Sequence, residues 1–249
     1  MALLKTVLAV LLILLAGSKS LFAQDIGPIN TERPSFSSSP LALPTGFWQV
    51  EAGYDYSRTL GSDGSKEHTL PDTLLRFGFY SRLEAQLKWS GYTWKNSSGS
   101  NTSGVKDGSL GVKWQLNSED SSFVAALFAG VSLPVGDNGF SSDDYDPELA
   151  LFWTYAGRLD WFGTAKLTES GNKYKLENAI GVNLTLANNT GAYVEYEGSF
   201  PEGQGPSHEA NFGVTWLLSN DLQVDVNGSL GLNSRASDYG LGTGIAYRF

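Results

Sequence analysis

The chain has 249 residues, with 17 lysines and arginines against 26 acidic residues and a formal net charge of −9 at pH 7. This acidic balance argues against a nucleic-acid-binding protein, which needs a basic face. No cysteine and only two histidines are present, which excludes disulfides and thiolate chemistry and leaves little basis for a metal site or a cofactor. The 29 glycines and the 12% aromatic residues favour an all-β protein.

The first segment has the features of a secretory signal peptide. Lys5 precedes an apolar run over residues 6–16, and a short stretch ends in the small residue Ala23. A transmembrane helix would need about 20 apolar residues, and this run is shorter. We therefore expect export and cleavage after Ala23, so that residues 1–23 are absent from the mature protein.

From residue 46 to the C-terminus, apolar and polar residues alternate over segments of about ten residues, which is the pattern of β-strands. We predict twelve strands, at 46–57, 69–79, 83–93, 105–116, 122–134, 148–156, 161–169, 173–186, 191–200, 208–218, 222–232 and 239–249. Residues 45–249 thus form the expected barrel domain. An even number of strands places both termini on the periplasmic side of a bacterial outer-membrane barrel.

Short and long connections alternate between these segments. The short ones are 80–82, 117–121, 157–160, 187–190 and 219–221, and the longer ones are 58–68, 94–104, 135–147, 201–207 and 233–238. Only the tight connection 170–172 departs from the alternation. Periplasmic turns and extracellular loops of membrane barrels differ in length in this way.

The two faces of the predicted sheet differ in charge. The apolar positions include only two charged residues, Lys106 and Glu169, both near segment ends. A soluble barrel or sandwich would turn this face inward, whereas a membrane barrel turns it to lipid and its charges to the lumen. The export signal, the loop lengths and the terminal strand ending in Phe249 favour the membrane barrel. Most of the seven tryptophans also lie on the apolar positions near strand ends, where interfacial aromatic girdles form.

Several short motifs resemble one outer-membrane family. Thr31–Phe36 and Gly46–Gly53 resemble the start of the "putative MetA-pathway of phenol degradation" family, whose members are called transporters. The segment 76–84 resembles its Arg-aromatic-Gly…Arg-Leu-Glu hairpin, and 107–113, 133–137 and 194–196 are similar to later landmarks. Val135 departs from the pattern, where a small polar residue is expected. The resemblance implies a barrel that takes up aromatic or other small compounds, without catalytic residues.

We expect an outer-membrane channel through which small solutes pass passively, with lumen charges setting the selectivity. The alternative is a closed structural or adhesive barrel whose charges pair across the wall. A charged lumen suits polar solutes and the family resemblance suggests aromatic ones. The residues predicted to line the lumen are Glu51, Arg76, Glu84, Lys88, Lys113, Glu195, Glu197 and Arg248.

Residues 24–44 precede the first strand and show no alternation. They are either a periplasmic tail or a partial plug. Glycines on the first and last strands, including Gly53 and Gly244, would leave room at the seam for such a segment. Its Glu32 and Arg33 would then pair with lumen charges such as Arg248 and Glu51.

The remaining motifs favour structural roles. The glycine run 240–244 precedes no helix and is not a phosphate loop. The acidic loop 137–146 lacks the spacing of a calcium loop and is interpreted as solvated. Ser207 and His208 lack a third partner for hydrolysis, so no enzyme is expected. The expected partners are the lipid bilayer with its lipopolysaccharide, a small solute, and the outer-membrane assembly machinery, which would recognise Phe249.

Overall fold

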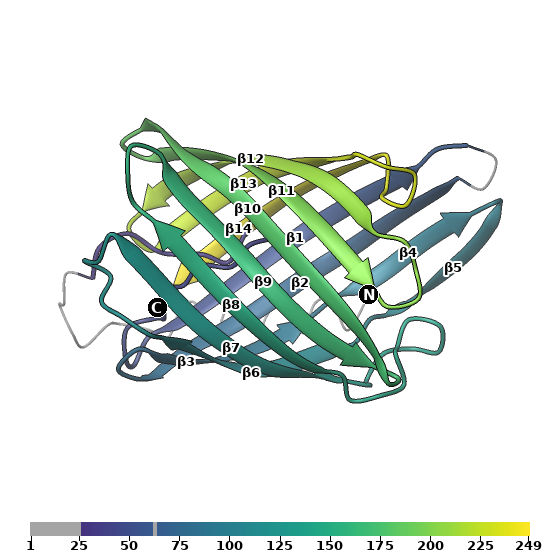
Figure 1. Cartoon of the computed structure of the whole chain (residues 1–249), viewed down its shortest axis with the longest axis horizontal. Coiled ribbons are helices and arrows are strands. Elements are labelled where there is room, and N and C mark those ends of the chain that lie inside the picture. The colour runs from purple at the N-terminus through teal and green to yellow at the C-terminus, as the bar shows by residue number, and fades with distance from the viewer. Residues whose placement is uncertain (1–25, 62–63) are drawn as a thin grey trace, which may run out of the picture.

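The computed structural model describes residues 26–61 and 64–249 and shows a closed antiparallel barrel (Figure 1). The predicted signal peptide lies outside the described residues. The strands in this part of the chain are β1 (Trp48–Thr59), β2 (Ser65–Tyr80), β3 (Leu83–Trp89), β4 (Tyr92–Ser97), β5 (Ser100–Val105), β6 (Gly108–Gln115), β7 (Phe123–Leu133), β8 (Pro147–Tyr155), β9 (Asp160–Ser170), β10 (Lys173–Ala187), β11 (Thr190–Pro201), β12 (Ser207–Ser219), β13 (Leu222–Gly231) and β14 (Tyr239–Arg248).

These elements make twelve strand positions around the wall. β2 pairs with β3 along its second half and with β4 along its first half, so β3 and β4 act as one strand interrupted at Ser90 and Gly91. β5 and β6 likewise act as one strand, interrupted at Lys106 and Asp107. Pairing of β1 with β14 closes the barrel, with Gly53 opposite Gly244. The predicted twelve-stranded up-and-down barrel is therefore confirmed.

The outer face is apolar and the inner face is charged. Leu87, Leu110, Ile180 and Ile245 are each close to half exposed on the outside, where lipid would cover them. The largest fully buried side chains are mostly polar or charged and face the lumen, led by Arg76. This arrangement is the inverse of a soluble core. Within the described residues, no helix combines the length and the apolar character that crossing a membrane requires.

Two predicted loops are largely strand. β1 runs to Thr59 and β2 starts at Ser65, and the predicted loop 94–104 is the β4–β5 hairpin. Its turn residues Ser98 and Gly99 have φ values of 48° and 82°, as a tight two-residue hairpin requires. These strand ends carry many polar residues, because above the bilayer neither face has to contact lipid.

The position of Lys106 also differs from the prediction. Its Nζ lies 2.6 Å from Oε1 of Glu67, whose side chain lines the lumen, and not on the lipid face. The interruption at Lys106 and Asp107 reverses which alternate residues face the lumen between β5 and β6. A prediction that continues the alternation of β6 back to residue 106 therefore places Lys106 on the lipid face, which is wrong.

A pair of neighbouring substitutions tests the assignment of the faces. Leu87→Arg places a charge on the lipid face and should lower the free energy of unfolding in lipid by about 2–4 kcal/mol. Lys88→Leu, at the next position, only removes a partly exposed ion pair with Asp72 and should cost far less. Urea unfolding in lipid vesicles measures both, and equal losses would contradict the assignment.

Candidate functional site

Residues 26–47 form no strand and run through the end of the lumen that holds the C-terminus (purple in Figure 1). We call them the lumen segment. Near its start, Arg248 on β14 donates to the Gly27 carbonyl oxygen at 2.7 Å. It continues past β13, where Gln223 Nε2 lies 2.8 Å from Thr31 Oγ1. It then contacts β11, β6 and β3 before it joins β1. Because it touches strands all round the wall, it crosses the lumen.

Arg76 on β2 is the centre of a buried ion network at this level. Its Nη2 lies 2.9 Å from Glu84 Oε2 and 3.1 Å from Glu32 Oε1, and its Nη1 lies 3.1 Å from Glu51 Oε1. Lys113 Nζ lies 2.5 Å from Glu32 Oε1 and 3.3 Å from Glu84 Oε1. The four wall residues are at most 1% exposed. Glu32 is the one member that the lumen segment contributes, and it bridges the two cations.

The strand register brings the wall members of this network together. Glu84 on β3 is directly opposite Lys113 on β6, and Arg76 on β2 is directly opposite Gln49 on β1. Opposite charges at facing positions of neighbouring strands attract. The network of wall charges is therefore a consequence of inward alternation on four adjacent strand positions.

Wall carboxylates accept hydrogen bonds from the backbone of the lumen segment. Glu51 accepts the N–H groups of Glu32 and Arg33, each at 3.0 Å. Glu84 accepts the N–H of Leu43 at 2.7 Å. On the β11 side, Glu195 accepts the N–H groups of residues 36 and 37, each at 2.9 Å. These charge-assisted bonds are stronger than neutral ones and hold the segment to three strands of the wall, β1, β3 and β11.

Wall cations bind the carbonyl groups of the same segment. Arg76 donates to the carbonyl oxygens of Asn30 at 2.8 Å and Leu41 at 3.2 Å. Lys113 Nζ lies 3.0 Å from the carbonyl oxygen of Ser39. The wall thus supplies partners of both signs to a chain that has no strand or helix of its own.

Arg33 lies against the seam where β1 and β14 meet. Its guanidinium faces Gly53 and Gly244, where a Cβ atom would collide with it. Asp225, Asp55 and Asp72 surround it, with N–O distances of 3.7, 3.8 and 3.9 Å.

The predicted side-chain pairs of Glu32 and Arg33 with Arg248 and Glu51 do not form, although Glu51 accepts the backbone N–H groups of both residues. Glu32 pairs with Arg76 and Lys113, while the Arg248 guanidinium binds Asp221 Oδ1 at 2.7 Å instead. Glu51 meets the backbone of Arg33, and the Arg33 side chain turns to the aspartates.

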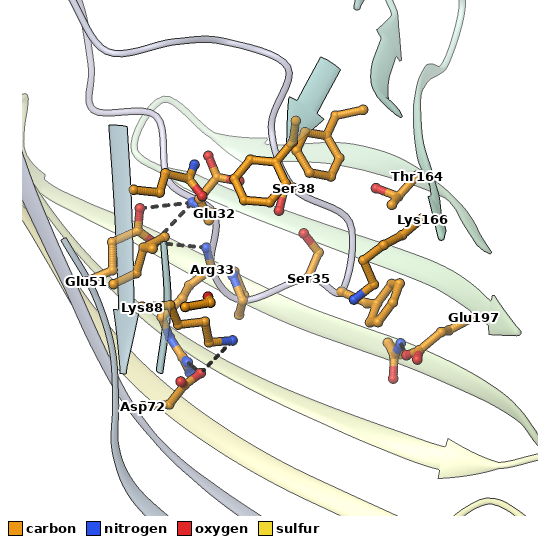
Figure 2. A pocket seen from close by; sticks show the side chains of 18 of the residues that line it. Glu32, Arg33, Ser35, Ser38, Glu51, Asp72, Lys88, Thr164, Lys166 and Glu197 are labelled. Carbon is orange, nitrogen blue, oxygen red and sulfur yellow. Dashed lines mark hydrogen bonds and ion pairs between the residues drawn. The ribbon is translucent and has the colours of Figure 1, made fainter. Parts of the chain in front are cut away.

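Two cavities lie on either side of the lumen segment. The first has a volume of about 420 Å³ and the second about 280 Å³, and Arg33, Pro34, Ser35 and Ser38 line both. Figure 2 shows the first cavity, with Lys88 and Asp72 on one side and Thr164, Lys166 and Glu197 on the other. The segment therefore forms the partition between them.

Phenylalanine rings form part of the wall of the first cavity. Phe128 and Phe152 line it, with ring centroids 6.0 Å apart. Phe36 of the lumen segment also lines it, and Lys166 Nζ lies 5.0 Å from its ring centroid. The cavity thus combines aromatic faces with charged groups.

The charge pattern alone did not reveal this aromatic wall, although a signal was present. Phe128 lies directly opposite Lys113 on the neighbouring strand, so it shares the inward parity. Gly111 and Gly130 lie against its ring, where a Cβ atom would collide. Inward-facing glycines on strand positions next to an inward-facing aromatic residue therefore indicate that the ring lies flat against the barrel wall.

The remaining predicted lumen residues lie in two places. Lys88 and Glu197 line the first cavity; Lys88 pairs with Asp72 at 3.6 Å and Glu197 accepts from Asn211 at 3.1 Å. Arg248 is 4% exposed at the end where the lumen segment starts.

The chain belongs to the family described as "Putative MetA-pathway of phenol degradation", whose model matches residues 31–249. The match begins inside the lumen segment and includes all the strands. No curated protein sequence matches the chain significantly.

Solved structures of outer-membrane channels share the fold. The COG4313 outer membrane channel from Pseudomonas putida F1 is 14% identical with a TM-score of 0.62, covering 84% of this chain and 97% of that one. The NanC porin is 11% identical with a TM-score of 0.54, covering 80% and 98%. The KdgM porin is 12% identical with a TM-score of 0.51, covering 81% and 99%. The chain therefore has the β-barrel fold of outer-membrane channels, and these three similar structures are a channel and two porins.

Arg76→Gln tests the importance of the network. It leaves Glu51, Glu84 and Glu32 buried with one cation, which should lower the free energy of unfolding by about 3–5 kcal/mol. Lys175→Gln is the control, because it removes a half-exposed partner of Glu177 and should cost under about 1 kcal/mol. Urea unfolding in lipid measures both, and a small loss in Arg76→Gln would contradict the central role of this residue.

Proposed function

We propose that this protein is a passive channel for small solutes, and that residues 24–44 act as a partial plug that narrows it. The observation that carries the proposal is the pair of cavities separated by a single crossing of the lumen segment. Of these two cavities, a solute entering from the loop side would reach the one of about 420 Å³ first, because it shares Asp55, Asp72 and Lys88 with the cavity that extends to the loop-side residues Glu67 and Lys106. Passage beyond it would depend on the contacts that hold the segment against the wall.

We also propose that the solutes combine an aromatic ring with a polar or charged group. Phe36, Phe128 and Phe152 offer faces and edges to a ring. Lys88 and Lys166 on the same cavity offer cations, and Glu197 offers a carboxylate. The expectations of polar and of aromatic solutes are therefore compatible, because both kinds of group line one cavity.

A closed structural barrel is the second candidate. The complete burial of Arg76 and Lys113 favours it, because a fully paired network at the lumen segment costs energy to open. The two candidates differ in ion conductance across a planar bilayer. Discrete steps favour the channel, and silence favours the closed barrel.

The terminal Phe249 is proposed as the signal for the outer-membrane assembly machinery. Its ring stacks on Tyr247 at 5.8 Å between centroids, and its backbone pairs with Trp48 at the barrel seam.

Deletion of residues 24–40, with the signal peptide kept, should raise the single-channel conductance without preventing assembly. The wall keeps two cations and two carboxylates at the network, Arg76 and Lys113 with Glu51 and Glu84, so its charge stays balanced. Planar-bilayer recording measures the change. Unchanged conductance in a correctly folded deletion would show that the segment is not a plug.

The double variant Phe128→Ala and Phe152→Ala should reduce the preference for aromatic solutes over a hexose of similar size. One ring contact is worth roughly 0.5–1.5 kcal/mol, so we expect the permeation ratio to fall about threefold or more. Phe212→Ala, on the lipid face, is the matched control. Liposome swelling measures the ratios, and equal ratios in all three proteins would contradict the assigned solute class.

A further inference from the structure

The extended ends of β1 and β2 carry two cations side by side on the outer face. Arg58 on β1 is directly opposite Lys66 on β2. Both face outward like Tyr56 and His68, which form the next outward-facing pair, two positions along the strands towards the membrane. Like charges at facing positions repel each other and are unfavourable unless an anion lies between them.

Neither cation has an acidic partner among the described residues. The ion pairs in this part of the chain include Lys95 and Lys106, which both turn to Glu67 on the lumen side, but not Arg58 or Lys66. The nearby carboxylate of Asp238 accepts the N–H of Leu60 at 2.7 Å and forms no ion pair with either cation. Within residues 26–61 and 64–249, no carboxylate competes with an external anion for this pair of cations.

A row of aromatic side chains lies next to this pair, towards the bilayer. Tyr56 contacts both His68, at 4.8 Å between ring centroids, and Tyr239, at 6.1 Å. Trp94 on β4 lies opposite His68, and its ring contacts Tyr92 in a tilted arrangement with 4.7 Å between centroids. Aromatic rows of this kind mark the membrane interface, and the headgroup region lies directly beyond them. Asn96, opposite Lys66, adds an amide to the cationic row.

We propose that Arg58 and Lys66 bind a phosphate group of lipopolysaccharide in the outer leaflet. An arginine and a lysine on neighbouring strands supply a planar guanidinium with several N–H donors and a compact ammonium charge. Together these groups are suited to binding a phosphate. The aromatic row would contact the sugar and the upper acyl chains of the same molecule. The site is separate from the lumen, so it does not depend on the proposed transport function. It would fix a lipid on the β1–β2–β4 face, next to the β1–β14 seam.

The test is lipid binding by the purified full chain in detergent, measured by native mass spectrometry. Wild type should bind bisphosphorylated lipid A roughly tenfold more tightly than enzymatically dephosphorylated lipid A. The double variant Arg58→Gln and Lys66→Gln should bind the two lipids equally, at the level of the dephosphorylated one. Lys95→Gln is the matched control, because it removes a cation from the adjacent strand on the lumen side, and it should behave as wild type.

Three results would overturn the proposal. They are wild-type discrimination in the double variant, equal binding of both lipids by wild type, and equally tight binding of phosphatidylglycerol, which would indicate a general attraction to anions. The double variant is expected to fold, because it removes a repulsion, and retention of heat-modifiable mobility in electrophoresis checks this. The single variant Lys66→Gln should show an intermediate loss of discrimination.

Discussion

An irregular segment inside a barrel must find partners for its backbone N–H and carbonyl groups, and the rest of this structure depends on how the wall supplies them. Buried backbone groups without partners are costly. In this protein Glu51, Glu84 and Glu195 accept N–H groups of the lumen segment, while Arg76, Lys113 and Arg248 donate to its carbonyl oxygens. The charged inner face therefore serves as a binding site for the protein's own chain.

This arrangement accounts for the composition of the lumen. A carboxylate or guanidinium buried without a partner would be strongly unfavourable. Here the wall charges neutralise one another across β1, β2, β3 and β6, and Glu32 completes the set from the segment. At the seam, Gly53 and Gly244 have no side chains, which leaves room for the guanidinium of Arg33. Wall and segment are thus complementary in shape as well as in charge.

Alternation in the sequence was sufficient to predict the barrel, because a strand in a membrane wall has one face on lipid and one on the lumen. It also predicted the inward direction of Arg76, Glu84 and Lys113. It failed where this constraint ends. Above the bilayer, the strand ends around Arg58 and Lys66 do not contact lipid, so neither of their faces has to be apolar. The sequence there lacks the alternation of a membrane strand and was predicted to be loop. At Lys106, the break between β5 and β6 reverses which alternate residues face inward, so the predicted face of Lys106 was wrong. The partners of Glu32 and Arg33 could not be predicted, because they depend on contacts between residues far apart in the chain.

Amide hydrogen exchange of the full chain in lipid nanodiscs tests the central claim most directly. The N–H groups of Glu32, Arg33, Phe36, Ser37 and Leu43 donate to wall carboxylates. These amides should exchange far more slowly than those of a free peptide, although they belong to no strand or helix. Arg76→Gln should reduce the protection at residues 32, 33 and 43 more than that at 36 and 37, which Glu195 holds. Exchange of all five amides at the free-peptide rate in the unmodified protein would contradict the account.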